Sequence, residues 1–200
     1  MKNRSNSPVL YMALRPLAVA LFKVIFRPCV KGKDNIPADG GAVLAGNHVS
    51  WWDCFMVMAG TSRCIHFLAK KEIFSTWFTR HFFNSAGLIP VNRQSKDHDA
   101  LVAAKEYLKN GAIIGVFPES TTIKPEGVTF LPFKIGAVKM ASDTGVPIIP
   151  FTISGRYKLW GKRVEIEFHE PVYITGTNLA EENEKLRERV ISKYKYEACN

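Results

Sequence analysis

Residues 41–60 of the chain read GAVLAGNHVSWWDCFMVMAG, a short apolar run followed by a polar turn and a second apolar segment. The run GAVLAG (41–46) predicts a buried strand, and the segment from Trp52 to about Gly60 predicts a helix. The same alternation of short apolar runs with helical patterns continues along the chain. It predicts an α/β fold, here a single domain with a largely parallel sheet flanked by helices.

The remaining elements are expected at similar spacing. We expect strands at residues 64–69, 87–91, 112–117, 146–153 and 164–168, and helices at 73–85, 97–110, 133–142 and 178–196. The clearest helix is 97–110, because its apolar residues share one face and Gly111 can end it. Reactive groups in parallel sheets collect at the carboxyl ends of the strands. Three residues with suitable side chains follow predicted strands: His48, Arg93 and Glu119.

The composition indicates a globular protein with an anionic partner. The length of 200 residues suits one domain, and 46% hydrophobic with 22% charged residues is unlike a disordered chain. The net charge of +9 favours nucleic acid, an anionic membrane or a phosphorylated substrate. No zinc-finger spacing or aromatic-basic RNA motif is present, so we expect no nucleic-acid partner. The cysteines form no C-x-x-C pair and fit a reducing cytosol: Cys29, Cys54, Cys64 and Cys199.

The basic residues of the N-terminal segment favour a membrane surface among these partners. Residues 1–33 hold no acid, and their seven bases alternate with apolar residues: Lys2, Arg4, Arg15, Lys23, Arg27, Lys31 and Lys33. Uncharged runs there are shorter than the ~20 residues of a spanning helix. Arg15, Lys23 and Arg27 fall within about 120° on a helical wheel. We therefore expect an amphipathic helix in the interface, a peripheral or monotopic protein on the cytoplasmic face, and a globular domain at 34–200. A merely solvated basic N-terminus stays open.

The residues most suited to catalysis in the opening stretch are His48 and Asp53. A histidine is the usual general base near neutral pH, and a carboxylate on one ring nitrogen leaves the other free to accept a proton. At a spacing of five residues the two side chains can meet if His48 ends the strand and Asp53 lies in the first turn of the next helix. On spacing alone, a capping or core arrangement is the more common outcome. Ser50 is a candidate nucleophile, but we favour direct deprotonation of a substrate hydroxyl.

Four ordered blocks of sequence, of which the His48 segment is the first, resemble those of the glycerolipid acyltransferase family. The blocks are NHVSWWD (47–53), GLIPVNR (87–93), VFPESTT (116–122) and VPIIPFTISG (146–155), and LPFKIGAVKMA (131–141) is similar to a further family segment. The resemblance spans about residues 30 to 170, so it makes 34–200 an acyltransferase domain. Four motifs in order are far more specific than any one of them.

The resemblance implies a reaction and a role for each matching residue. It implies an acyl-CoA or acyl-carrier-protein donor, a lysophosphatidic acid acceptor and phosphatidic acid as the product. His48 would deprotonate the glycerol 2-hydroxyl and Asp53 would orient His48. Arg93 would hold the acceptor phosphate, since a guanidinium binds phosphate in bidentate fashion. Glu119 would position the acceptor or hold the site together, and neither a metal nor a cofactor is expected.

The third block departs from the family pattern. After the glutamate the family reads Gly-Thr-Arg, whereas this chain reads Ser120-Thr121-Thr122. Without the glycine the loop can follow a different backbone path, and without the arginine a charged phosphate ligand is lost. Replacement cations are expected among Lys124, Lys134 and Arg156.

This departure leaves three functions open. They are acylation of lysophosphatidic acid, acylation of a different lysolipid acceptor, and non-catalytic lipid binding. The aromatic residues of 77–83 are equally consistent with a lipid-facing patch and with a buried helix.

Overall fold

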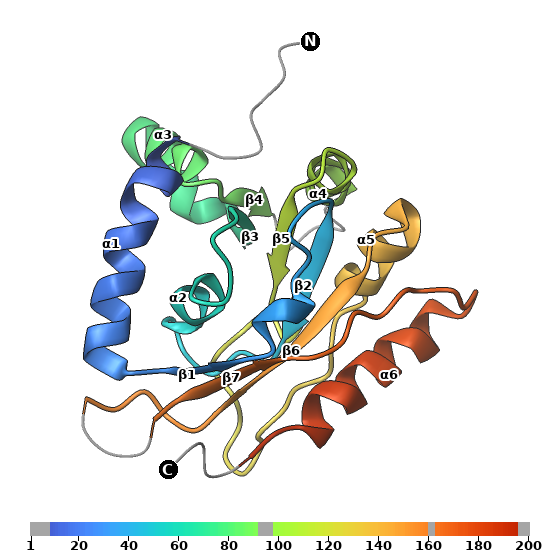
Figure 1. Ribbon diagram of the computed structural model, residues 1–200. Helices are drawn as coiled ribbons and strands as arrows, with labels where there is room; N and C mark the ends of the chain where they lie inside the picture. Colours follow the sequence, from blue (N-terminus) through green and yellow to red (C-terminus); the bar gives the residue numbers. More distant parts are fainter. Residues whose placement is uncertain (1–8, 92–97, 160–162, 196–200) are drawn as a thin grey trace.

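The computed structural model describes residues 9–91, 98–159 and 163–195, which form one sheet with helices on both faces (Figure 1). The strands follow the order β1-β7-β6-β2-β5-β3-β4 across the sheet. Their bounds are β1 (Cys29–Lys31), β2 (Ala42–Gly46), β3 (Ile65–Lys70), β4 (Ile89–Val91), β5 (Ile113–Val116), β6 (Ile148–Ser154) and β7 (Glu165–Phe168).

The helices alternate with the strands along the chain. They are α1 (Val9–Phe26), α2 (Asp53–Met58), α3 (Trp77–Ser85), α4 (His98–Lys109), α5 (Gly136–Thr144) and α6 (Leu179–Ser192), with short 3₁₀ turns η1 (Lys33–Asn35) and η2 (Lys71–Phe74). The predicted α/β fold with a mostly parallel sheet is confirmed. Three predicted helices differ in extent: the one expected at 73–85 is divided into η2 and α3, the one expected at 133 begins at Gly136, and the one expected at 178–196 ends at Ser192.

The five strands from β6 to β4 are parallel, and the other two reverse direction. β7 pairs antiparallel with β6, and β1 pairs parallel with β7. The expected N-terminal helix therefore ends earlier than its apolar run, because residues 29–31 join the sheet. β2 and β5 are parallel neighbours, with Ala45 opposite Val116. The loops that follow these two strands consequently emerge side by side.

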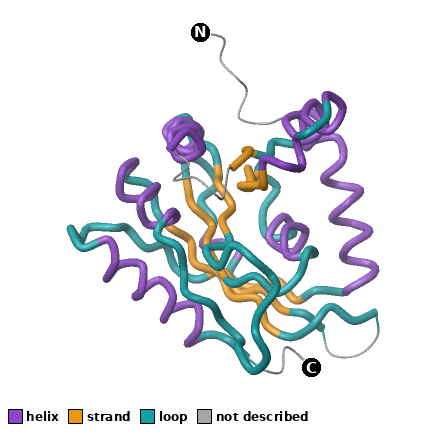
Figure 2. Tube along the Cα trace, turned by 180° about the vertical axis from the view of Figure 1, so that it is seen from behind, coloured by secondary structure: helices purple, strands orange, loops and turns teal. Residues whose placement is uncertain are grey.

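The sheet separates two cores. One contains Phe22 and Phe26 of α1 and Met56 and Val57 of α2, packed on β2, β3 and β6. The other contains apolar residues of α4, α5 and α6. Figure 2 shows the same layers from behind, with the sheet between the two groups of helices. A two-sided burial explains why most strands read as continuous apolar runs instead of alternating patterns.

Helix α1 has one face in the core and another exposed. Phe22 is 2% exposed, whereas Leu17 and Val24 on the outer side are 72% and 75% exposed. Arg15 does not share a solvent-facing basic stripe with Lys23 and Arg27, because its guanidinium donates to the main-chain carbonyls of Met58 and Thr61. It satisfies the carbonyl of the last residue of α2, which lacks a helical partner, and one in the turn that follows. The domain boundary expected at residue 33 stays a prediction.

Candidate active site

His48 lies in the loop directly after β2, where the strand–turn–helix pattern placed it. Its Nδ1 lies 2.7 Å from Oδ2 of Asp53. Its ring stacks on Phe117 at a centroid distance of 4.1 Å and an interplanar angle of 13°. The side chain is 17% exposed, so a substrate can reach it. One ring nitrogen is thus engaged and the face of the ring is fixed.

Asp53 begins α2 and is fully buried. Its Oδ2 accepts the main-chain N–H groups of Val49 at 2.7 Å and Ser50 at 2.9 Å, in addition to His48. A buried carboxylate needs several donors to offset its lost hydration. The two main-chain bonds also fold the 48–53 loop around the carboxylate, so the turn that carries His48 and the residue that orients it are built together.

Tyr157 provides the donor to the other oxygen of Asp53. Its hydroxyl donates to Oδ1 at 2.6 Å, across 104 residues of sequence. Burial, and then the negative charge of Asp53, raise the pKa of Tyr157 well above its ordinary value, so the hydroxyl keeps its proton. The ring packs edge-on against Phe26 of α1 at 5.4 Å. Sequence reasoning missed Tyr157, because it follows the fourth block and no local spacing links it to Asp53.

The geometry of the His48–Asp53 pair, called the dyad below, favours His48 as a base that acts directly on a substrate. With Nδ1–H donating to Asp53, Nε2 is the proton acceptor. Ser50 Oγ accepts the main-chain N–H of Trp52, and no contact joins it to His48 among the described residues. Burial, followed by the charge of Asp53, raises the pKa of Cys54 to about 12, so its thiol stays protonated near neutral pH. Neither side chain is set up as an enzyme nucleophile.

Glu119, after β5, joins the His48 loop to the loop that precedes α5. Its Oε1 accepts the main-chain N–H of His48 at 2.9 Å, and its Oε2 accepts that of Leu131 at 2.7 Å. Lys124 Nζ lies 2.8 Å from Oε2, and both side chains are largely buried. Every oxygen of the carboxylate is therefore engaged by the protein itself. This arrangement suits a residue that holds the site together.

Asn47 braces the same loop from the other side. Its Oδ1 accepts the main-chain N–H of Ile153 at 2.7 Å, and its Nδ2 donates to the carbonyl of Ile153 at 2.8 Å. The side chain is completely buried. The paired bonds fix the end of β2 against β6 one residue before His48. The sequence analysis did not single out Asn47, although a polar residue directly after a buried strand was a visible signal.

The unusual third block keeps a sharp turn without glycine. Ser120 has φ of 61°, in the left-handed region that glycine occupies at little cost. Its main-chain N–H donates to the carbonyl of Phe117. Thr121 Oγ1 accepts the main-chain N–H of Ile123, and Thr122 lies partly exposed beside it. Serine therefore adopts the backbone conformation for which a glycine is usually needed.

The expected phosphate ligands have different surroundings. Lys124 donates to the carbonyl of Thr129 and lies over the ring of Phe130, besides pairing with Glu119. Lys134 and Arg156 are exposed. Arg93 lies outside the described residues. Lys124 is thus committed to Glu119, while Lys134 and Arg156 present their side chains to solvent.

Comparisons with known proteins agree with this geometry. A family model described as Acyltransferase matches residues 27–154. The 1-acyl-sn-glycerol-3-phosphate acyltransferase of Bacillus subtilis is 32% identical over 127 residues, covering 63% of this chain and 62% of that protein. The one from Borreliella burgdorferi is 28% identical over 160 residues, covering 79% of this chain and 63% of that protein.

A solved structure extends the likeness to nearly the whole chain. The crystal structure of the 1-acyl-sn-glycerophosphate (LPA) acyltransferase PlsC from Thermotoga maritima gives a TM-score of 0.68 at 25% identity. The match covers 96% of this chain and 82% of that one. The matches to these two curated relatives, in contrast, cover less than two thirds of their length.

Proposed function

Because this chain belongs to the acyltransferase family, we propose that it moves a fatty acyl group from a thioester donor to the hydroxyl of a lysophospholipid. The proposed acceptor is 1-acylglycerol-3-phosphate and the product is phosphatidic acid, after the names of its relatives. The observation that carries the proposal is the His48–Asp53 contact of 2.7 Å, made by a histidine whose side chain is 17% exposed.

The reaction follows from the orientation of the histidine. Nε2 of His48 takes the proton of the acceptor hydroxyl as its oxygen attacks the thioester carbonyl. The buried carboxylate of Asp53 stabilises the imidazolium that forms. The tetrahedral intermediate then expels the thiolate, which takes the proton from His48. A thioester is already activated toward acyl transfer, so the proposed donors, acyl-CoA or acyl-carrier protein, supply the driving force and we propose no metal or cofactor.

A second candidate keeps the reaction and changes the acceptor to another lysolipid. Two observations favour it: Thr122 stands where the family has an arginine, and Lys124 is already held by Glu119. A neutral hydroxyl bond is roughly half as strong as a charge-assisted one. The acceptor phosphate would then depend on Arg93, Lys134 or Arg156. A panel of lysolipids decides between the candidates, since a clear preference for lysophosphatidic acid would exclude the second.

We also propose that α1 and α3 contact a membrane, on its cytoplasmic face and without a spanning segment. The outer face of α1 is apolar and exposed, and α3 carries two exposed aromatic residues, Trp77 and Phe78, which are 75% and 69% exposed. α3 lies beside the first turns of α1 (Figure 1). By length and composition α1 is also long enough to cross a bilayer. Its buried face, with Phe22 in the core and Arg15 on α2, supports the interfacial position.

The test measures thiol release and lipid product together. Purified protein is incubated with lysophosphatidic acid vesicles and acyl-CoA or acyl-carrier protein, and wild type is compared with His48→Ala. Loss of a positioned general base costs about 10²–10⁴ in rate. Product from the wild type and a loss of that order in the variant support the proposal. Absence of product with any donor and any lysolipid would overturn it.

A further inference from the structure

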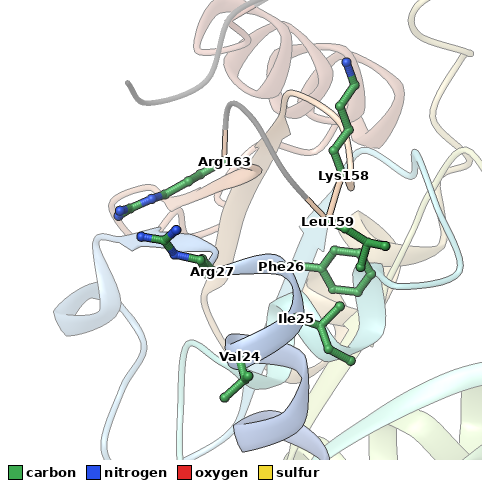
Figure 3. A pocket seen from close by; sticks show the side chains of 7 residues that line it. All are labelled: Val24, Ile25, Phe26, Arg27, Lys158, Leu159 and Arg163. Atoms are coloured by element: carbon green, nitrogen blue, oxygen red, sulfur yellow. The ribbon is translucent and has the colours of Figure 1, made fainter.

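A pocket of about 420 Å³ lies at the carboxyl end of α1. Figure 3 shows the side chains that line it: Val24, Ile25, Phe26, Arg27, Lys158, Leu159 and Arg163. They come from the last turn of α1, the segment after β6 and the residue two before β7. His48 and Asp53 are not among them. The pocket thus shares no catalytic residue with the site described above, although Phe26 in its lining packs against Tyr157 of that site.

The charged residues of the pocket are all positive. The described lining holds Arg27, Lys158 and Arg163 and no acid, and no ion pair joins any of the three to a carboxylate within residues 9–91, 98–159 and 163–195. The guanidinium groups of Arg27 and Arg163 point to the same side of the pocket (Figure 3). Like charges gathered in this way repel one another unless an anion lies between them. A phosphate suits two arginines because each can bind it in bidentate fashion.

Arg27 occupies its place at a conformational cost. Its φ is 46°, in the left-handed region, at the end of a helix where glycine is the usual residue. Its main-chain N–H still donates to the carbonyl of Lys23. A non-glycine residue held in this region at a ligand-sized pocket points to a function for its side chain.

The other part of the pocket is apolar and open. Val24 is 75% exposed and Leu159 is 65% exposed. From Val24 the exposed apolar surface continues along α1 through Leu21 and Leu17, which are 58% and 72% exposed. The surface thus has cations at one end and an apolar track leading away from them. That pattern is complementary to a molecule with an anionic head and a hydrocarbon tail.

We propose that this pocket binds the phosphate headgroup of an anionic phospholipid of the bilayer. The phosphate lies between Arg27 and Arg163, and one acyl chain follows Val24 and Leu21 along α1. The inference rests on the proposed membrane position of α1, but it does not depend on acyl transfer. The bound lipid differs from the acceptor, because the acceptor hydroxyl must reach His48.

The test is binding to vesicles in the absence of acyl donor. Cosedimentation is measured with phosphatidylcholine vesicles and with vesicles containing phosphatidylglycerol, for Arg27→Gln, Arg163→Gln and the double variant. Lys23→Gln is the matched control: Lys23 is an exposed base one turn earlier on α1 and does not line the pocket. A base near an anionic surface contributes about fivefold to binding by charge alone.

A specific phosphate site and a diffuse surface charge predict different results in this binding assay. If the arginines share one phosphate, each arginine variant weakens binding to anionic vesicles by about tenfold or more, and the double variant loses less than the product of the two. Lys23→Gln then weakens binding to anionic vesicles by about fivefold or less. When Lys23→Gln is combined with Arg163→Gln, the two losses in binding multiply. Equal losses for Lys23→Gln and Arg27→Gln, with fully multiplicative effects throughout, would overturn the site. Binding is read without turnover, so a failure of the acyltransferase proposal leaves this result intact.

Discussion

The hydroxyl of Tyr157 can be removed without changing the shape of the site, by Tyr157→Phe. The hydroxyl is the one donor to Oδ1 of Asp53 among the described residues, at 2.6 Å, and Asp53 is fully buried. A hydrogen bond to a charged group contributes about 1.5–3 kcal/mol. We therefore expect the free energy of unfolding to fall by about 2 kcal/mol. For a chain of this size that lowers Tm by roughly 4–8 °C.

Catalysis should fall together with stability, because a loosened Asp53 orients His48 less well. If half of the lost energy, about 1 kcal/mol, appears in the transition state, kcat falls by about fivefold, since 1.36 kcal/mol corresponds to a factor of ten. KM for the acceptor stays nearly unchanged, because the Tyr157 hydroxyl is bonded to Asp53. The assay is initial-rate acyl transfer well below Tm, with thermal melting measured on the same samples.

Two comparisons make this prediction specific. Tyr173→Phe is the matched control, because Tyr173 is 61% exposed and should change neither Tm nor kcat. In a His48→Ala background, Tyr157→Phe should still lower Tm but should cause no further loss of rate, because it acts through the dyad. Wild-type kcat in Tyr157→Phe, or an equal rate loss in the His48→Ala background, would refute this reasoning.

Three further predictions concern other buried or strained residues. Glu119→Gln should lower the free energy of unfolding by about 3 kcal/mol, because it leaves the largely buried Lys124 without its counter-charge. Urea unfolding measures this change, and an unchanged urea midpoint would contradict the prediction. Ser120→Gly should stabilise by about 0.5–1 kcal/mol, since relief of the left-handed strain exceeds the added backbone entropy, and a lower urea midpoint would argue against it. Burial raises the pKa of Cys54 and Cys64 to about 12, so the folded state holds these two protons to higher pH than the unfolded chain does. This contribution to stability should be full below pH ~9 and should be lost as pH rises toward 12, so Tm should fall over that range. The fall should be less steep in the variant with both cysteines changed to alanine, and a pH-independent Tm of the wild type would count against the prediction.

The sequence predicted those features that depend on local pattern. The apolar runs anticipated β2, β3, β5 and β6, because a strand buried on both faces has little polar content. The approach of His48 and Asp53 followed from a strand, a turn and a helix within thirteen residues. The family resemblance, carried by four short blocks, is confirmed by the match of the acyltransferase model to residues 27–154.

Features that depend on distant contacts escaped prediction. Tyr157 meets Asp53 across 104 residues, so no spacing rule connects them. β1 is three residues long and pairs with β7, and its residues looked like the end of an apolar helix. The Glu119–Lys124 pair is closer in sequence, at five residues, but it forms because the 119–124 loop turns back on itself; whether Lys124 also binds phosphate stays a prediction. Whether Arg93 binds substrate stays a prediction.

The pairing of β1 with β7 also has a consequence for the order of events on the ribosome. Lys31 and its partner Glu165 are separated by 134 residues. At about 5–20 residues per second, roughly 7–27 s pass between the synthesis of the first strand and that of its neighbour. During this interval α1 has been made but Tyr157 has not. Both the aromatic inner face of α1 and its apolar outer face are therefore uncovered. At the membrane position proposed for α1, a bilayer would shelter both faces of the helix from aggregation until the last strand arrives.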